Sequence, residues 1–175
     1  MDHFERLGLP RRFSVDADAI EREYLARSRT IHPDFHQLGT GGEQRASLEL
    51  TAALNEANLT LRDPIRRTEY LLTLYGGPTG PQEKSLDQMF LMEMMDVREQ
   101  FEEAKASKDT AALAALETDL TARNAAQLGQ IAKLFERFEQ LPDDHADRSG
   151  LLVQVRRVLN AVKTVRSLLR DLRLD

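Results

Sequence analysis

Hydrophobic positions recur three or four residues apart along almost the whole chain, which is the period of an amphipathic helix. In the first half this pattern predicts a short helix that ends at Pro10 and a second helix from an N-cap at Asp16 to about Ile31. A third helix follows, and a fourth begins at the N-cap Asp63 and a first-turn Pro64. No alternating run of β-branched residues is long enough to predict a strand, so the predicted fold is all-α. The apolar stripe of the third helix consists of Leu50, Ala53, Leu54, Ala57 and Leu61.

The second half carries three longer helical patterns, over about 86–106, 110–140 and 150–172. Long helices with short connections predict an antiparallel three-helix bundle. The stretch "YGGPTGPQEKS" precedes them, and its glycines and prolines are typical of a boundary between domains. The sequence therefore predicts an N-terminal domain over 1–75, a linker over 76–84 and a C-terminal bundle over 85–175.

Composition narrows the class of protein. The chain has 175 residues, of which 41% are hydrophobic and 30% charged, as in an ordinary soluble globular protein. No apolar run approaches the ~18 residues of a membrane span, and the start of the sequence resembles neither a signal peptide nor a transit peptide, so we expect a cytoplasmic protein. A net charge of −5 argues against a nucleic-acid binder. The absence of cysteine excludes disulfides, thiol catalysis and clusters held on thiolates, and nothing in the sequence indicates a cofactor.

The turn after the second helix carries three polar or rigid residues, His32, Pro33 and Asp34. Proline fixes φ and stops the helix, so its neighbours are held at the tip of a helical hairpin. Histidine and aspartate then offer a donor and an acceptor to a partner, and the carboxylate can take a charge-assisted contact from an arginine. This turn is a candidate binding site rather than part of a core.

One side of the second helix, which precedes this turn, is basic. On a helical wheel Ile20, Tyr24 and Ile31 share one side, whereas Arg22 and Arg29 lie on the opposite side. We expect both arginines to steer the turn toward an acidic partner.

The first long C-terminal helix carries two faces. Phe90, Met94, Val97, Phe101 and Ala104 form one core stripe. A helix of a three-helix bundle needs one buried stripe, so a second apolar group bordered by acids is either a wide core contact or a docking surface, and methionines suit an adaptable surface. This second face carries Leu91, Met92, Met95, Asp96, Glu99 and Glu103.

The sequence resembles two nested families. An HPD tripeptide after an Ile-x-x-x-Tyr helix resembles the J-domain co-chaperones, in which this tripeptide activates a DnaK-type chaperone ATPase. The segments "DHFERLGLP", "HPDF", "LRDPIRRTEYLLTLYG" and "FLMEMMDVRE" together resemble HscB, the J-protein of iron–sulfur cluster assembly, over both domains.

The resemblance implies two partners and two sites. The J-domain, through His32, Pro33, Asp34, Arg22 and Arg29, would stimulate the ATPase of a DnaK/HscA-type chaperone. The bundle would present the scaffold protein IscU to that chaperone, and the likeness assigns scaffold binding to the second face of the first long helix. Val158 on the last helix aligns with a further residue of that face, which is often aromatic in the family. A monomer is expected.

The sequence departs from the J-domain pattern at two positions. Arg27 stands in the apolar stripe of the second helix, where leucine is usual, and we expect its stem to cover the core while the guanidinium reaches outward, with some loss of stability. Phe35 follows the tripeptide in place of the lysine of general J-proteins, which matches part of the HscB family.

Other classes of function fit less well. A metal site could use His32 and His36 four residues apart, but Pro33 breaks the helix between them. A Ser–His–Asp hydrolase lacks a nucleophile elbow, and no glycine-rich phosphate loop is present, so the chain is not expected to be an enzyme. Two alternatives stay open: a J-domain co-chaperone for a different client protein, and a purely structural helical adaptor.

Overall fold

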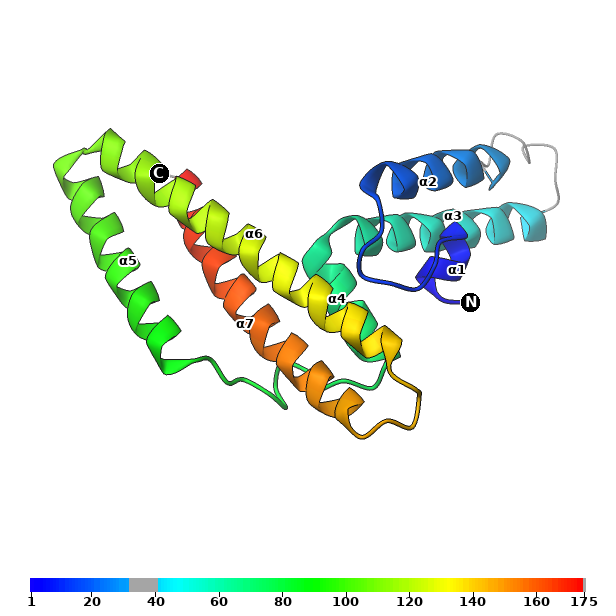
Figure 1. Ribbon diagram of the computed structural model, residues 1–175. Helices are drawn as coiled ribbons and strands as arrows, with labels where there is room; N and C mark the ends of the chain where they lie inside the picture. The colour runs from blue at the N-terminus through cyan, green and yellow to red at the C-terminus, as the bar shows by residue number, and fades with distance from the viewer. Residues whose placement is uncertain (32–40, 175) are drawn as a thin grey trace. The chain divides into compact units, whose positions relative to one another are not determined.

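The computed structural model describes residues 1–31 and 41–174, and within them every regular element is a helix (Figure 1). This confirms the all-α prediction. Along the chain the helices divide into two compact units, Met1–Leu71 and a second unit from Leu72 onward. The helices are α1 (His3–Leu7), α2 (Ala17–Ile31), α3 (Gly41–Arg62), α4 (Pro64–Leu74), α5 (Gln88–Ser107), α6 (Thr110–Gln140) and α7 (Asp147–Leu174).

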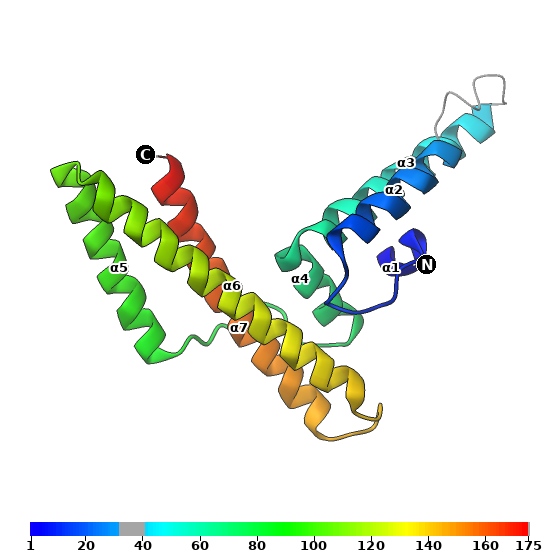
Figure 2. The same cartoon turned by 45° about the horizontal axis from the view of Figure 1, so that its top comes forward.

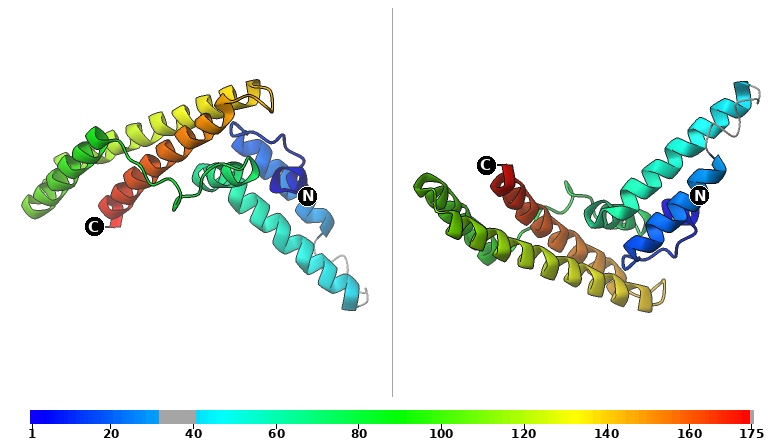
Figure 3. Two further views of the ribbon diagram at one scale, coloured as in Figure 1. Left: turned by 90° about the horizontal axis from the view of Figure 1, so that it is seen from below. Right: turned by 90° about the horizontal axis from the view of Figure 1, so that it is seen from above.

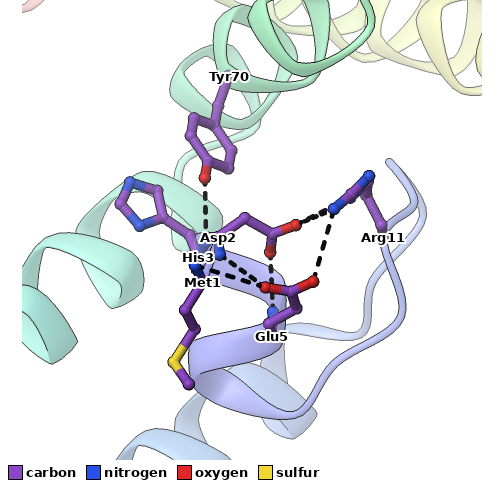
Figure 4. A network of polar contacts seen from close by, with 6 residues as sticks. All are labelled: Met1, Asp2, His3, Glu5, Arg11 and Tyr70. Carbon is purple, nitrogen blue, oxygen red and sulfur yellow. Dashed lines mark hydrogen bonds and ion pairs between the residues drawn. The ribbon is translucent and has the colours of Figure 1, made fainter.

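Short polar side chains set the helix starts in the first unit. Asp2 accepts a hydrogen bond from the N–H of Glu5 at 2.8 Å, and the Glu5 carboxylate accepts one from the N–H of Asp2, a capping box that Arg11 completes from the following loop (Figure 4). Asp16 accepts from the first turn of α2, and Asp63 from the N–H of Ile65 at 2.7 Å. The predicted caps at Asp16 and Asp63 are therefore present.

The core of the first unit lies where α1, α2 and α3 meet, and α2 and α3 run antiparallel as a hairpin (Figure 2). Phe4, Leu7 and Ile20 are buried there, together with Leu54 and Leu61 of the predicted α3 stripe. Leu50 of that stripe is 48% exposed, so the stripe is not buried along its whole length. Periodicity reports the direction of a side chain, but it does not report how far along α3 the neighbouring helices reach.

Side-chain hydrogen bonds between described residues join α2 to α3. The Tyr24 hydroxyl donates to Asn55 Oδ1 at 2.8 Å. Ser47, which is almost fully buried, donates from its hydroxyl to the carbonyl of Ile31 at 2.7 Å. This second bond lies at the last residue of α2, so it anchors the C-terminal end of that helix to α3.

In the second unit α6 and α7 run side by side over most of their lengths, and α5 packs on one end of the pair (Figure 3). The predicted bundle and its core stripe on α5 are present, because Met94, Val97, Phe101 and Ala104 are buried and Phe90 is partly buried. The cluster that joins α5 to the other two helices contains Met94, Val97, Leu120, Val165, Leu168 and Leu169.

The start of α7 differs from the sequence-based expectation. The helix begins at Asp147 rather than near Gly150. Arg148 in its first turn stacks its guanidinium 3.9 Å from the centre of the Phe138 ring and donates to the carbonyls of Phe138 and Leu141, at 3.2 and 2.6 Å. These contacts satisfy the last carbonyls of α6 and order the residues before Gly150 into the helix.

The segment between α4 and α5 is fastened to α7. Arg156, only 2% exposed, donates from Nε to the carbonyl of Pro78 at 2.8 Å. Arg157 pairs with the Glu83 carboxylate at 3.1 Å, and the Asn160 amide donates to the carbonyl of Glu83 at 3.0 Å. Residues 78–83, within the stretch predicted as a linker, therefore have defined contacts within the second unit.

Candidate functional site

The first candidate site was predicted in the sequence between α2 and α3. His32, Pro33 and Asp34 fall outside the described residues. Arg22 and Arg29 lie exposed on α2, and Ile20, which belongs to the opposite side of the wheel, is 1% exposed. The structure thus places the basic face of α2 in solvent, as the helical wheel predicts. The Ser47 bond to Ile31 fixes the end of this helix.

The second candidate site is the face of α5 that points away from the bundle core. Leu91 is 43% exposed, Met92 59% and Met95 71%. Large apolar side chains are seldom so exposed side by side unless they meet a partner. The interpretation of these residues as a wide core contact is therefore wrong, and they are available as a docking surface.

The acids predicted for this face lie along the same side of α5. Asp96, Glu99 and Glu103 are exposed. At about 100° per residue, the six predicted positions fall within about 140° of the helix circumference. We call these six residues, Leu91, Met92, Met95, Asp96, Glu99 and Glu103, the α5 face. It is apolar in its N-terminal half and acidic in its C-terminal half.

Val158 lies on α7, outside the α5 face. It is half-buried on α7 and lines a hollow of about 400 Å³ together with Phe90, Gln127 and Ala161. Leu91 and Met95 line a different hollow, in which α7 contributes Lys163. The structure thus gathers the α5 residues on one surface and places Val158 at a neighbouring hollow of the bundle.

Two residues of α5 were missed by the sequence reasoning. Met89 is 69% exposed in the first turn, and Glu102 is exposed. On the helical wheel Glu102 lies between Leu91 and Met95, and Met89 lies next to Asp96. The helical wheel that identified the α5 face could have found both residues, because it considers only the angle of each side chain around the helix axis.

The described part of the chain offers no group of three or more His, Cys, Asp or Glu side chains placed to hold a metal ion. Over the same residues, no helix combines the length and apolar character that crossing a membrane requires.

Comparison with known proteins agrees with this arrangement. The family model of the HSCB C-terminal oligomerisation domain matches residues 86–158, which include the α5 face and Val158. The structure of the chaperone HscB from Vibrio cholerae is similar over 99% of this chain and 96% of that chain, with 28% identity and a TM-score of 0.82. The crystal structure of the human co-chaperone protein HscB shares the fold over 99% of this chain and 81% of that chain, with 24% identity and a TM-score of 0.83.

The helical hairpin unit followed by a three-helix bundle defines a class, the J-domain co-chaperones with a helical C-terminal domain. Within this class the chain is similar to the HscB-type co-chaperones, through the family-model match over residues 86–158 and the fold that it shares with the HscB chaperones.

Proposed function

We propose that this protein is a co-chaperone of iron–sulfur cluster assembly that delivers an IscU-type scaffold to a DnaK/HscA-type chaperone and stimulates the ATPase of that chaperone. The observation that carries the proposal is the exposed apolar and acidic α5 face inside the segment that matches the HscB domain. In this proposal the chain is not an enzyme, because its partner chaperone hydrolyses the ATP. We also propose that the chain acts in the cytoplasm.

The proposed mechanism uses the two units for two contacts. Leu91, Met92 and Met95 desolvate against the scaffold, and the acids beside them select a basic neighbour on it. His32, Pro33 and Asp34 dock on the chaperone, toward which Arg22 and Arg29 steer the hairpin. ATP hydrolysis then closes the chaperone on the scaffold that the bundle has brought to it.

The scaffold contact is tested by calorimetry with the full-length chain and the purified IscU-type scaffold. Wild type should bind saturably. Leu91→Ser and Met92→Ser together should weaken binding about a hundredfold, since each removes a partly exposed anchor worth about tenfold. Leu59→Ser, at a leucine of α3 that is 54% exposed, is the matched control and should bind as wild type. Circular dichroism checks that each variant keeps its helicity.

A folded chain that stimulates the chaperone but does not bind the scaffold would support the alternative, a J-domain co-chaperone for a different client. The exposed α5 face lies within the segment that matches the HscB C-terminal domain, and this favours the scaffold over that alternative. We propose that the chain acts as a monomer. Analytical sedimentation of the free chain tests this. If the chain forms a dimer and Met92→Ser dissociates it, the α5 face would bind a second copy of the chain instead of the scaffold.

The chaperone contact is tested by Asp34→Asn. We expect at least about tenfold less ATPase stimulation, because the amide cannot accept the charge-assisted hydrogen bonds of the carboxylate, and unchanged scaffold binding. A structural adaptor would show no dependence on this substitution. Full stimulation by Asp34→Asn would therefore contradict a J-protein role.

A further inference from the structure

A groove runs between α5 and α6 on the acidic side of the α5 face. It has a volume of about 660 Å³. Apolar side chains line part of the groove: Val97, Ala104 and Leu116, together with the small Ala112 and Ala115. Ala115 is exposed, so this part of α6 is open to solvent. Small side chains on the floor leave room for the side chains of another polypeptide.

The rims of the groove are acidic. Glu93 and Asp119 both bond the guanidinium of Arg123, at 2.6 and 2.7 Å, so that cation is already neutralised from both walls. These hydrogen bonds raise the pKa of Arg123, which stays charged. Asp109 accepts from the N–H of Ala112 as the N-cap of α6.

Asp96 and Glu103 are the remaining acids on the rim. Among the described residues their carboxylates have no hydrogen-bond or ion-pair partner. They lie two turns apart on α5, about 10 Å along the helix axis. Both also belong to the α5 face, so the groove continues the proposed scaffold surface around the helix and onto α6.

We propose that the α5–α6 groove binds a basic segment of the scaffold protein, with two Lys or Arg side chains about 10 Å apart flanking small apolar residues. The cations would pair with Asp96 and Glu103, and the apolar residues would cover Ala112 and Ala115. This inference rests on the proposed function and adds the chemistry of the bound segment and a second wall, on α6. Charge complementarity at a partly apolar groove favours a basic occupant.

The test places a cation in the groove without substituting any residue of the α5 face. Ala115→Arg does so from α6, and Gln100→Lys does so from α5, where Gln100 lines the groove and is exposed. Ala114→Arg is the matched control, because Ala114 is also exposed on α6 but does not line the groove. Scaffold binding by the full-length variants is measured by calorimetry at about 50 mM and about 300 mM salt.

We expect Ala115→Arg and Gln100→Lys each to weaken scaffold binding about tenfold at low salt, and less at high salt, where the repulsion is screened. Ala114→Arg should stay within about twofold of wild type. If Ala115→Arg loses helicity, Gln100→Lys alone decides, since it changes one exposed side chain on an unbroken helix.

Wild-type affinity in both groove variants, while Leu91→Ser and Met92→Ser together still weaken binding about a hundredfold, would overturn the groove and leave the proposed function standing. A wild-type chain that does not bind the scaffold would overturn both. A chain that dimerises, and whose groove variants dissociate the dimer without changing scaffold affinity, would assign the groove to a second copy and overturn the proposal.

Discussion

Arg27 shows at the scale of one residue how a charged side chain occupies an apolar stripe. Its guanidinium lies over Gly8, where a Cβ would collide with it, and forms an ion pair with Glu23 at 3.3 Å. Gly8 also ends α1 with a left-handed φ of 66°, so two features of the fold favour glycine there. The Nε atom of Arg27 is buried, and no hydrogen-bond partner for it exists among the described residues.

We expect Arg27→Leu to raise the free energy of unfolding by about 1 kcal/mol, because it removes an unpaired buried N–H and adds apolar contact. The lost ion pair subtracts little, since both side chains are partly exposed, 35% and 41%. Urea unfolding of the full-length chain, followed by circular dichroism, measures the change.

Glu23→Gln serves as the control for Arg27→Leu. It breaks the same ion pair, leaves Arg27 in place and should cost less than about 0.5 kcal/mol. A less stable Arg27→Leu variant would mean that the contact of the guanidinium with Gly8 outweighs its unpaired Nε.

At the scale of elements, the segment before α5 behaves as part of the bundle. Arg156 donates a hydrogen bond to the carbonyl of Pro78. The Glu83 carboxylate accepts a hydrogen bond from the N–H of Ser85 and forms an ion pair with Arg157. Hydrogen bonds from the Ser85 side chain and N–H, and to a smaller extent from Arg157, lower the pKa of Glu83 from an ordinary 4.5 to about 2. The folded state therefore favours the ionised carboxylate more than the unfolded chain does.

The sign of the pH dependence follows from this lowered pKa. The stabilising contribution of Glu83 is complete above about pH 4.5, where both states are ionised, and is lost as pH falls toward about 2. Wild type should therefore be more stable than Glu83→Gln at pH 7, and the gap should narrow below pH 4.5. Urea unfolding of both proteins between pH 7 and pH 3 measures it.

Arg157→Gln separates the two causes of this effect. In a chain that carries Arg157→Gln, most of the loss of stability caused by Glu83→Gln at pH 7 should persist, because the Ser85 hydrogen bonds lower the pKa of Glu83 more than the ion pair does. A gap independent of pH would contradict the assigned role of Glu83.

At the scale of the whole molecule, the two partner contacts that we propose for this chain would reinforce each other. In the proposed mechanism, a chaperone that engages the J-domain would meet the scaffold held by the bundle at a raised effective concentration. Neither contact would then need to be tight, which suits the proposed delivery of a scaffold that must later be released.

We therefore expect the scaffold to increase ATPase stimulation several-fold when the co-chaperone is below saturation. Met92→Ser should keep the stimulation seen without scaffold and lose the increment. The scaffold added to the chaperone alone gives the background to subtract. An equal increment with Met92→Ser would place the coupling outside the α5 face.

Periodicity and local signals in the sequence determined most of the elements. Caps at Asp16, Asp63 and before Thr110 depend on a few neighbouring residues, so the helices they begin could be predicted. The helical period alone separates Met94 and Val97 from Met92 and Met95 by their angle around α5. The same local information identified the all-α class and the family resemblance.

Tertiary structure decided whatever depends on distance between elements. Leu50 lies on the right face of α3, yet its burial depends on how far the other helices reach. The early start of α7 depends on the contact of Arg148 with Phe138. The α5–α6 groove depends on packing that brings Ala104 of α5 and the small Ala112 and Ala115 of α6 to one hollow. A sequence pattern reports the direction of each side chain, because that direction follows from the local backbone. The partner that a side chain meets is determined by packing between residues far apart in the chain.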